Sequence, residues 1–109
     1  MNPDHGLSPQ TIARIGEVLA RFPEVEKATL FGSRAKGTHR PGSDIDLALA
    51  GHGLDWRTFS RIEDAFDETL LPYSFSLIGH NAETDRDVAA HIARVGILLY
   101  ERLPQAVSR

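Results

Sequence analysis

The chain is poor in the residues that mark several classes of protein. It has no cysteine, one methionine and one tryptophan among 109 residues. Without cysteine it can form neither a disulfide framework nor a thiolate metal site. No apolar run approaches the ~20 residues that a membrane-spanning helix needs. The first ten residues also lack the basic and apolar regions of a secretory signal. We therefore expect a cytoplasmic protein with no membrane partner.

Positive charge is scarce as well. The 12 Lys and Arg residues are outnumbered by 15 Asp and Glu, and the formal net charge is −3. A chain with this charge is not expected to bind extended nucleic acid, so any affinity for phosphate must come from a local group of cations. The composition is that of a single globular domain spanning residues 1–109. Residues 1–7 and 103–109 are expected to be flexible.

Hydrophobic periodicity predicts a chain in which helices and strands alternate. About a dozen residues join the first two predicted strands. Because this is too short for a helical crossover, the two strands are expected to be antiparallel. The predicted fold is α/β (α+β), a small mixed sheet of about four strands with helices packed on it. The predicted helices are 8–22, 55–70 and 84–95, and the last of them is expected to open with a capping box at Thr84-Asp85-Arg86-Asp87. The predicted strands are 25–31, 44–50, 73–78 and 97–100.

Two aspartates lie on the same side of the second predicted strand. Asp44 and Asp46 belong to the alternating run DIDLALA, which places their Cα atoms about 7 Å apart. Carboxylates this close raise each other's pKa unless a cation lies between them. Sites made only of oxygen ligands suit Mg²⁺ or Mn²⁺, which often complete their shell with substrate phosphates. The pair indicates half of a metal site, with a solvent-facing strand edge as the alternative.

The segment before these aspartates is suited to binding phosphate. Gly32 permits close approach of a ligand to the backbone, and Ser33 offers a hydroxyl. The residues that follow can begin a short helix, whose N-terminus favours anions. An ordinary turn with solvated cations is the alternative. Positive charge gathers here in an otherwise acidic protein, at Arg34, Lys36, His39 and Arg40.

The spacing of these residues resembles a known signature. Gly32-Ser33, ten residues and then Asp44-Ile45-Asp46 is similar to the G-S-x10-D-x-D pattern of the DNA polymerase β-like nucleotidyltransferase superfamily. The segments LFGSRAKG and GSDIDLAL resemble its minimal nucleotidyltransferase (MNT) domains, which are about as long as this chain and share its element order. The resemblance implies that Asp44 and Asp46 are the catalytic metal ligands. It also implies a nucleotide-binding set: Gly32, Ser33, Arg34, Lys36 and Ser43.

The same resemblance implies a reaction. The cofactor is Mg²⁺ or Mn²⁺, and the substrate is ATP or another nucleoside triphosphate. A nucleotidyl group, AMP in the case of ATP, is transferred to an acceptor hydroxyl while pyrophosphate leaves.

One position departs from the family pattern. The superfamily usually carries a third carboxylate on a later strand, where this chain reads PYSFSLIG and has Ser76. A hydroxyl brings no charge to a metal and is a poor base at neutral pH. No Asp or Glu lies between Pro72 and Asn81. The remaining alternative is a carboxylate from the preceding predicted helix, namely Asp64, Asp67 or Glu68. The five histidines show no metal-ligand spacing, and structural or exposed roles are expected for them.

Three functions stay open on the sequence alone. The first is a metal-dependent nucleotidyltransferase (EC 2.7.7.-) that transfers AMP to a hydroxyl of a partner protein or small molecule. MNT domains are typically encoded beside a helical HEPN protein, as the antitoxin of a toxin–antitoxin pair, so a HEPN-type partner is implied. The second is a weakened or inactive nucleotide-binding protein that neutralises this partner by binding. The third is a detached recognition subunit of a larger transferase. The oligomeric state is left open.

Overall fold

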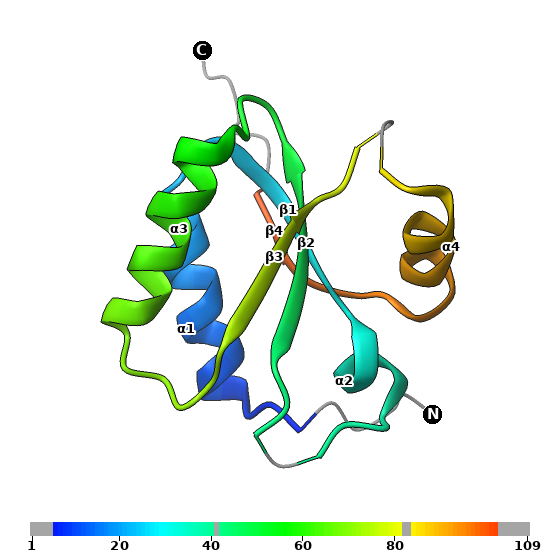
Figure 1. Cartoon of the computed structure of the whole chain (residues 1–109). Coiled ribbons are helices and arrows are strands. Elements are labelled where there is room, and N and C mark those ends of the chain that lie inside the picture. Colours follow the sequence, from blue (N-terminus) through cyan, green and yellow to red (C-terminus); the bar gives the residue numbers. More distant parts are fainter. Residues whose placement is uncertain (1–5, 41, 82–83, 103–109) are drawn as a thin grey trace.

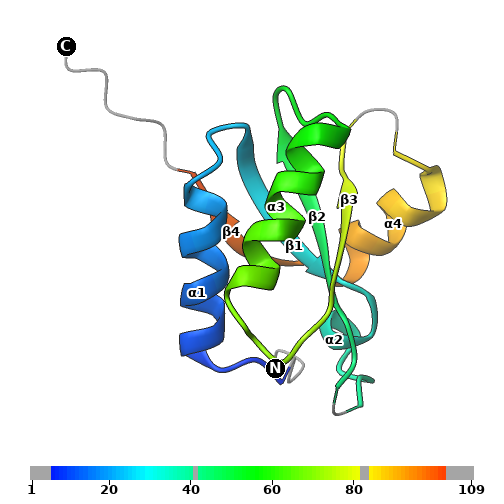
Figure 2. The same ribbon diagram turned by 60° about the vertical axis from the view of Figure 1, so that its left-hand side comes forward.

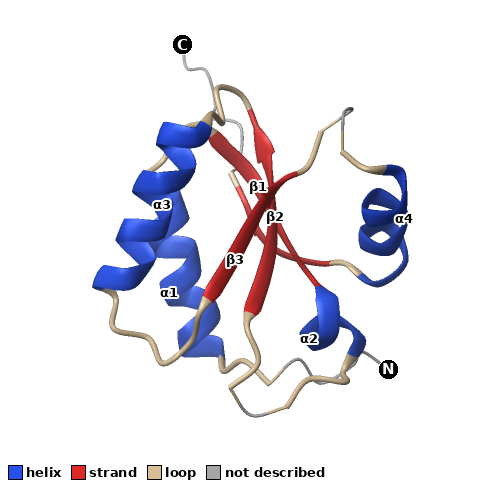
Figure 3. Ribbon diagram, in the orientation of Figure 1, coloured by secondary structure: helices blue, strands red, loops and turns tan. Residues whose placement is uncertain are grey.

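The structure is a computed structural model that describes residues 6–40, 42–81 and 84–102. Within these ranges helices and strands alternate, as the periodicity predicts (Figures 1 and 3). The predicted flexible ends lie outside the described residues at 1–5 and 103–109. None of the described helices has the length and apolarity needed to cross a membrane. The elements are α1 (Pro9–Ala20), β1 (Val25–Phe31), α2 (Gly32–Lys36), β2 (Ile45–Gly51), α3 (Trp56–Glu68), β3 (Phe75–Gly79), α4 (Arg86–Val95) and β4 (Ile97–Glu101).

The strands form one mixed sheet in the order β3-β2-β1-β4. β1 pairs antiparallel with both β2 and β4, whereas β2 and β3 are parallel. Parallel neighbours need a crossover connection, and α3 provides it. The predicted mixed sheet and the antiparallel pairing of the first two strands are thus confirmed.

Helices cover both faces of this sheet. In Figures 1 and 2, α1 and α3 lie side by side on one face, while α2 and α4 lie on the other. The alternation in β2 turns Ile45, Leu47 and Leu49 towards the α1–α3 layer, where all three are fully buried in the core. The intervening residues of β2, including Asp46, therefore face the side that carries α2 and α4.

The predicted helix starts coincide with side-chain caps. Ser8 accepts a hydrogen bond from the backbone N–H of Thr11 (3.1 Å) and precedes Pro9, the first residue of α1. Asp55 accepts hydrogen bonds from the backbone N–H (2.9 Å) and the hydroxyl (3.0 Å) of Thr58 at the start of α3. These two bonds lower the pKa of the Asp55 carboxyl. Each cap satisfies a backbone donor that has no partner within its own helix.

The start of α4 differs from the predicted capping box by one residue. Asp85, rather than Thr84, is the N-cap, and its carboxylate accepts from the backbone N–H groups of Asp87 and Val88. The hydroxyl of Thr84 instead donates to the carbonyl of Gly79 (3.2 Å). Thr84 is therefore bonded back to the end of β3.

Leu7 also departs from the expectation of a flexible arm. Its side chain is 7% exposed and belongs to the main hydrophobic core. Burying an apolar side chain of this size stabilises a fold by about 1.5–3 kcal/mol. Leu7 thus helps to fix the chain just before α1 begins.

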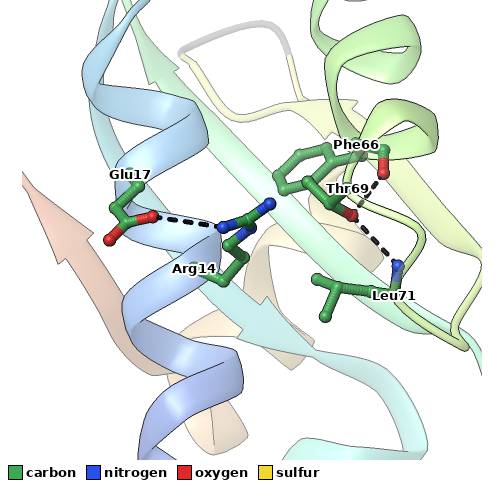
Figure 4. A network of polar contacts seen from close by, with 5 residues as sticks. All are labelled: Arg14, Glu17, Phe66, Thr69 and Leu71. Atoms are coloured by element: carbon green, nitrogen blue, oxygen red, sulfur yellow. Dashed lines mark hydrogen bonds and ion pairs between the residues drawn. The ribbon is translucent and has the colours of Figure 1, made fainter.

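Helix α3 ends two residues before Leu70, the last apolar residue that the sequence assigned to it. The hydroxyl of Thr69 donates to the carbonyl of Phe66 (2.6 Å) and accepts from the Leu71 N–H (3.2 Å), as Figure 4 shows. Leu70 has φ +59° and is 88% exposed. Its side chain therefore points to solvent instead of continuing the buried stripe of the helix.

Replacing Leu70 with Gly is expected to stabilise the protein by about 0.5–1 kcal/mol. A leucine in the left-handed region carries a steric cost that glycine avoids, and an exposed side chain gives up little packing. Urea denaturation measures the change. Leu98→Gly in the edge strand β4 is the control, because Leu98 is 51% exposed but is not among the positive-φ residues. If both substitutions destabilise the protein equally, replacing Leu70 with Gly does not relieve backbone strain.

Candidate active site

Asp46 lies near the start of β2, between strands on both sides. The register pairs it with Phe31 of β1 and with Ser76 of β3. Its side chain is half-buried, whereas Asp44 lies just before the strand and is exposed. The predicted carboxylate pair thus has one member anchored in the sheet and one at the rim of the site.

The electrostatics of the two carboxylates agree with their closeness. Burial raises the pKa of the Asp46 carboxyl above its ordinary value, and the negative charge of Asp44 raises it further. A protonated His91 would act in the opposite direction and lower this pKa. The site therefore favours positive charge close to Asp46.

Gly32 brings the backbone against the carboxylate of Asp46. It has φ +75°, a conformation that side chains rarely adopt. A Cβ built at this position would collide with the Asp46 carboxylate oxygen. A glycine is therefore required here for two reasons, the backbone angle and the close approach. The Gly32–Ser33 turn and Asp46 form one site although 13 residues separate Gly32 from Asp46 in the chain.

His91 is a site residue for which the sequence suggested no functional role. Its Nε2 accepts a hydrogen bond from the Gly32 N–H at 3.0 Å, and its ring packs edge-on against Phe31. One signal was available in the sequence. His91 lies three residues after Val88 and four before Val95, which places a titratable side chain on the inward face of the helix.

Arg34 is predicted to neutralise phosphate, and the structure shows that its guanidinium has other partners. The residue is 2% exposed. Its Nε and Nη2 both donate to the carbonyl of Ser43, at 3.1 and 3.0 Å, and the guanidinium lies 5.0 Å from the ring centre of Tyr73. Because Ser43 directly precedes Asp44, these contacts position the loop that presents the carboxylate.

Replacing Arg34 with Met is expected to lower the free energy of unfolding by about 2–3 kcal/mol. The substitution removes charge-assisted hydrogen bonds to a backbone carbonyl and a cation–π contact. Lys36→Met is the matched control, since Lys36 is an exposed cation on the same short helix. Urea denaturation of both variants measures the difference. Equal and small changes in the two would show that the buried guanidinium does not hold the loop.

The other predicted nucleotide-binding residues lie around the same turn. Ser33 is half-buried in α2, next to Gly32, and Lys36 is exposed at the end of this helix. The hydroxyl of Ser43 accepts a hydrogen bond from the Arg40 N–H at 2.9 Å. Gly32 lies directly beside Asp46 and Ser33 is its neighbour in the chain, whereas Ser43 and Arg40 shape the loop between α2 and β2.

β3 brings a hydroxyl to the position beside Asp46. Ser76 is exposed and is the parallel-strand partner of Asp46, so both side chains face the same side of the sheet. The acidic residues of α3 do not replace a carboxylate here, because α3 covers the opposite face (Figure 1). Those residues, Asp64, Asp67 and Glu68, are all exposed.

The donor set fits a metal ion that binds together with a ligand. The described part of the chain contains no group of three or more His, Cys, Asp or Glu side chains that could hold a metal. Two carboxylates, one of them with a raised pKa, form an incomplete oxygen site. Mg²⁺ commonly takes one or two protein carboxylates and completes its shell with water and substrate phosphates.

The fold and the order of these residues match a known family of transferases. The family model described as "Polymerase beta, Nucleotidyltransferase" matches residues 13–105, and the chain belongs to this family. A curated relative from Haemophilus influenzae, "Probable protein adenylyltransferase MntA", is 36% identical over 97 residues, which cover 88% of this chain and 84% of that protein. The resemblance stated from the sequence is thereby confirmed.

Solved structures confirm the fold. A toxin–antitoxin crystal structure with AMP-PNP matches with a TM-score of 0.69 and 22% identity, over 84% of this chain and 73% of that one. A complex of the tri-AMPylated Shewanella oneidensis HEPN toxin with MNT antitoxin matches with a TM-score of 0.62 and 18% identity. This second match covers 84% of this chain and 70% of the other.

Proposed function

We propose that the protein is a metal-dependent nucleotidyltransferase of the MntA type, which transfers AMP from ATP to a hydroxyl of a HEPN-type partner protein. The observation that carries the proposal is the contact between the Gly32 turn and the Asp46 carboxylate. It joins the two halves of the G-S-x10-D-x-D pattern in one site. The MntA relative and the toxin–antitoxin complexes among the structural neighbours support the choice of acceptor.

In this proposal the carboxylates and the glycine turn bind different parts of the nucleotide. Asp44 and Asp46 hold Mg²⁺ or Mn²⁺, which would neutralise charge on the phosphates and on the attacking and leaving oxygens. Gly32 and Ser33 bind the terminal phosphates, and Lys36 is the exposed cation closest to them along the chain. Arg34 and Ser43 act indirectly, because the two hydrogen bonds that Arg34 donates to the Ser43 carbonyl position Asp44.

The proposed reaction is a displacement at the α-phosphorus. The acceptor hydroxyl oxygen forms a bond to this phosphorus while the bond to the oxygen that bridges to the β-phosphate breaks. Pyrophosphate leaves with that electron pair, and the hydroxyl proton passes to solvent or to a carboxylate. The chain's contribution is to align the triphosphate so that the α-phosphorus faces the acceptor, which is a large part of catalysis in phosphoryl transfer.

Ser76 favours a second candidate function. Its hydroxyl lies beside Asp46 at the position where the family resemblance leads one to expect a third carboxylate. If transfer is too slow to matter without that carboxylate, the protein would bind nucleotide and neutralise its partner by association alone. The two candidates differ in whether the partner becomes covalently modified.

Incubation with Mg²⁺, a HEPN-type partner and ATP labelled on its α-phosphate tests the proposal. The partner should become labelled with wild-type protein and with the control Glu63→Gln, which alters an exposed charge on α3. Asp44→Asn should transfer no label. Absence of label with the wild type would refute the transferase. Full neutralisation of the partner by Asp44→Asn would establish the binding function instead.

A further inference from the structure

One hydrogen-bond donor of the glycine turn already has a partner within the protein. The Gly32 N–H donates to Nε2 of His91, 59 residues later in the chain, at 3.0 Å. Gly32 is the first residue of α2, and the preceding N-cap residue, Phe31, makes no side-chain cap bond. The imidazole of α4 therefore satisfies a backbone donor that a helix start leaves open.

The His91 ring is held in this place by packing as well. It meets the Phe31 ring edge-on, with 6.2 Å between centres and 83° between planes. Its neighbour Ile92 is 5% exposed, and α4 packs against β1 and α2. Figure 1 shows α4 and α2 on the same face of the sheet. The imidazole thus connects α4, from which it extends, to the glycine turn.

The chemistry of this contact makes it replaceable by a stronger one. Because Nε2 accepts the Gly32 N–H, this nitrogen carries no proton and acts as a neutral acceptor. A phosphate oxygen is a charged acceptor, and hydrogen bonds to charged acceptors are about twice as strong as neutral ones. One N–H cannot bond fully to both acceptors.

We propose that His91 competes with the terminal phosphate of a nucleoside triphosphate for the Gly32 N–H, so that nucleotide binding releases α4 from the glycine turn. This rests on the proposed function, in which Gly32 binds phosphate. His91 is then a positioning residue that lowers nucleotide affinity. Only the molecules in which the Gly32 N–H is free can bind the phosphate fully, so the apparent Kd rises as that fraction falls.

His91→Ala should therefore bind nucleotide more tightly than the wild type. Removing one neutral hydrogen bond that competes with the ligand is expected to lower the Kd about fivefold. His91→Gln should keep the wild-type Kd, because a glutamine carbonyl can still accept the N–H. Arg94→Ala controls for changes in the helix itself, since Arg94 is exposed on α4.

Titration calorimetry of these full-length variants with AMP-PNP and Mg²⁺ distinguishes the outcomes. Tighter binding by His91→Ala alone supports the competition. An unchanged Kd overturns it, and so does weaker binding, because the imidazole would then contact the nucleotide directly. If neither the wild type nor any variant binds AMP-PNP, the proposed function itself fails, and the competition fails with it.

A measurement on the wild type does not depend on how the variants fold. Long-range ¹H–¹⁵N spectra report the hydrogen bonding of the imidazole nitrogens, and the Gly32 amide resonance reports its acceptor. Saturating AMP-PNP with Mg²⁺ should shift both the Nε2 and the Gly32 signals. If Nε2 and Gly32 keep their nucleotide-free shifts at saturation, the bond persists and the proposal is wrong.

Discussion

Replacing Asp46 with Asn is expected to reduce AMP transfer to a HEPN-type partner by at least about 1,000-fold, a typical loss when an essential catalytic group is removed. Asn keeps the shape of the side chain but removes the charge that would hold a divalent ion. The carboxylate also lies against the Gly32 turn, so this acidic group contacts the predicted phosphate site. Transfer of label from α-labelled ATP measures the rate.

The control for this substitution is Asp64→Asn. Asp64 is exposed on α3, on the face of the sheet away from the site (Figure 1), and its loss changes the net charge by the same amount. It should retain the wild-type rate. A comparable loss in both variants would point to a general effect of charge, and an Asp46→Asn variant with normal activity would remove Asp46 from the mechanism.

Asp46→Asn should lower activity but should not lower the free energy of unfolding at neutral pH. Burial and the charge of Asp44 raise the pKa of Asp46 in the folded protein, so the folded state binds a proton more readily than the unfolded state. The stability that this proton contributes is fully present below the unfolded pKa of about 4 and is lost as the pH rises through the folded pKa. Asp46→Asn should therefore equal or exceed the wild type in stability at pH 7.

Urea denaturation between pH 3 and 8 tests this linkage. The difference in unfolding free energy between Asp46→Asn and the wild type should increase in favour of the variant as the pH rises from about 4. A difference that shrinks over this range would mean that the charge of Asp46 stabilises the folded protein. Such a result would contradict a site in which two nearby carboxylates repel each other and favour a cation.

Replacing Gly32 with Ala is expected to weaken nucleotide binding, raising the Kd for AMP-PNP at least about tenfold. The left-handed conformation alone costs an alanine roughly 1–2 kcal/mol. Here the added Cβ would also collide with the Asp46 carboxylate, so the turn or the carboxylate must shift. Either shift separates the two halves of the site.

Gly42→Ala separates these two effects. Gly42 has φ +85°, and a Cβ built there meets nothing within 4 Å. The variant should lose about 1–2 kcal/mol of stability from backbone strain while keeping its affinity for AMP-PNP. If both alanine variants lose affinity to the same extent, strain in the loop rather than the collision with Asp46 is responsible. Calorimetry and urea denaturation together distinguish the cases.

Elements and motif positions were predictable because they depend on local chemistry. Ser8 and Asp55 cap helices at the predicted places, and the strict alternation after Asp44 produced a strand whose Ile45, Leu47 and Leu49 are fully buried on one side. Where the prediction failed, a neighbouring residue offered a better local bond. Asp85 rather than Thr84 caps α4, and the Thr69 hydroxyl bonds at the end of α3 before Leu70.

Long-range partners were not predictable from the pattern. Arg34 looked like a cation for phosphate, but its guanidinium bonds to Ser43 and packs on Tyr73. His91 showed no ligand spacing, yet it bonds to Gly32. The Arg34–Tyr73 and Gly32–His91 contacts join segments far apart in the chain, and a side chain's partners across such a distance depend on packing that no local signal encodes.

By itself, the sequence predicted which residues carry the proposed chemistry, because the spacing of a glycine turn and two carboxylates is a property of the chain. It also determined the mixed sheet, since connection length and periodicity limit how strands can pair. Only the tertiary structure decided that Gly32 touches Asp46, that Ser76 stands beside it and that His91 occupies the Gly32 N–H. Those contacts follow from strand register and helix packing, in which residues far apart in the chain meet at distances of a few ångströms.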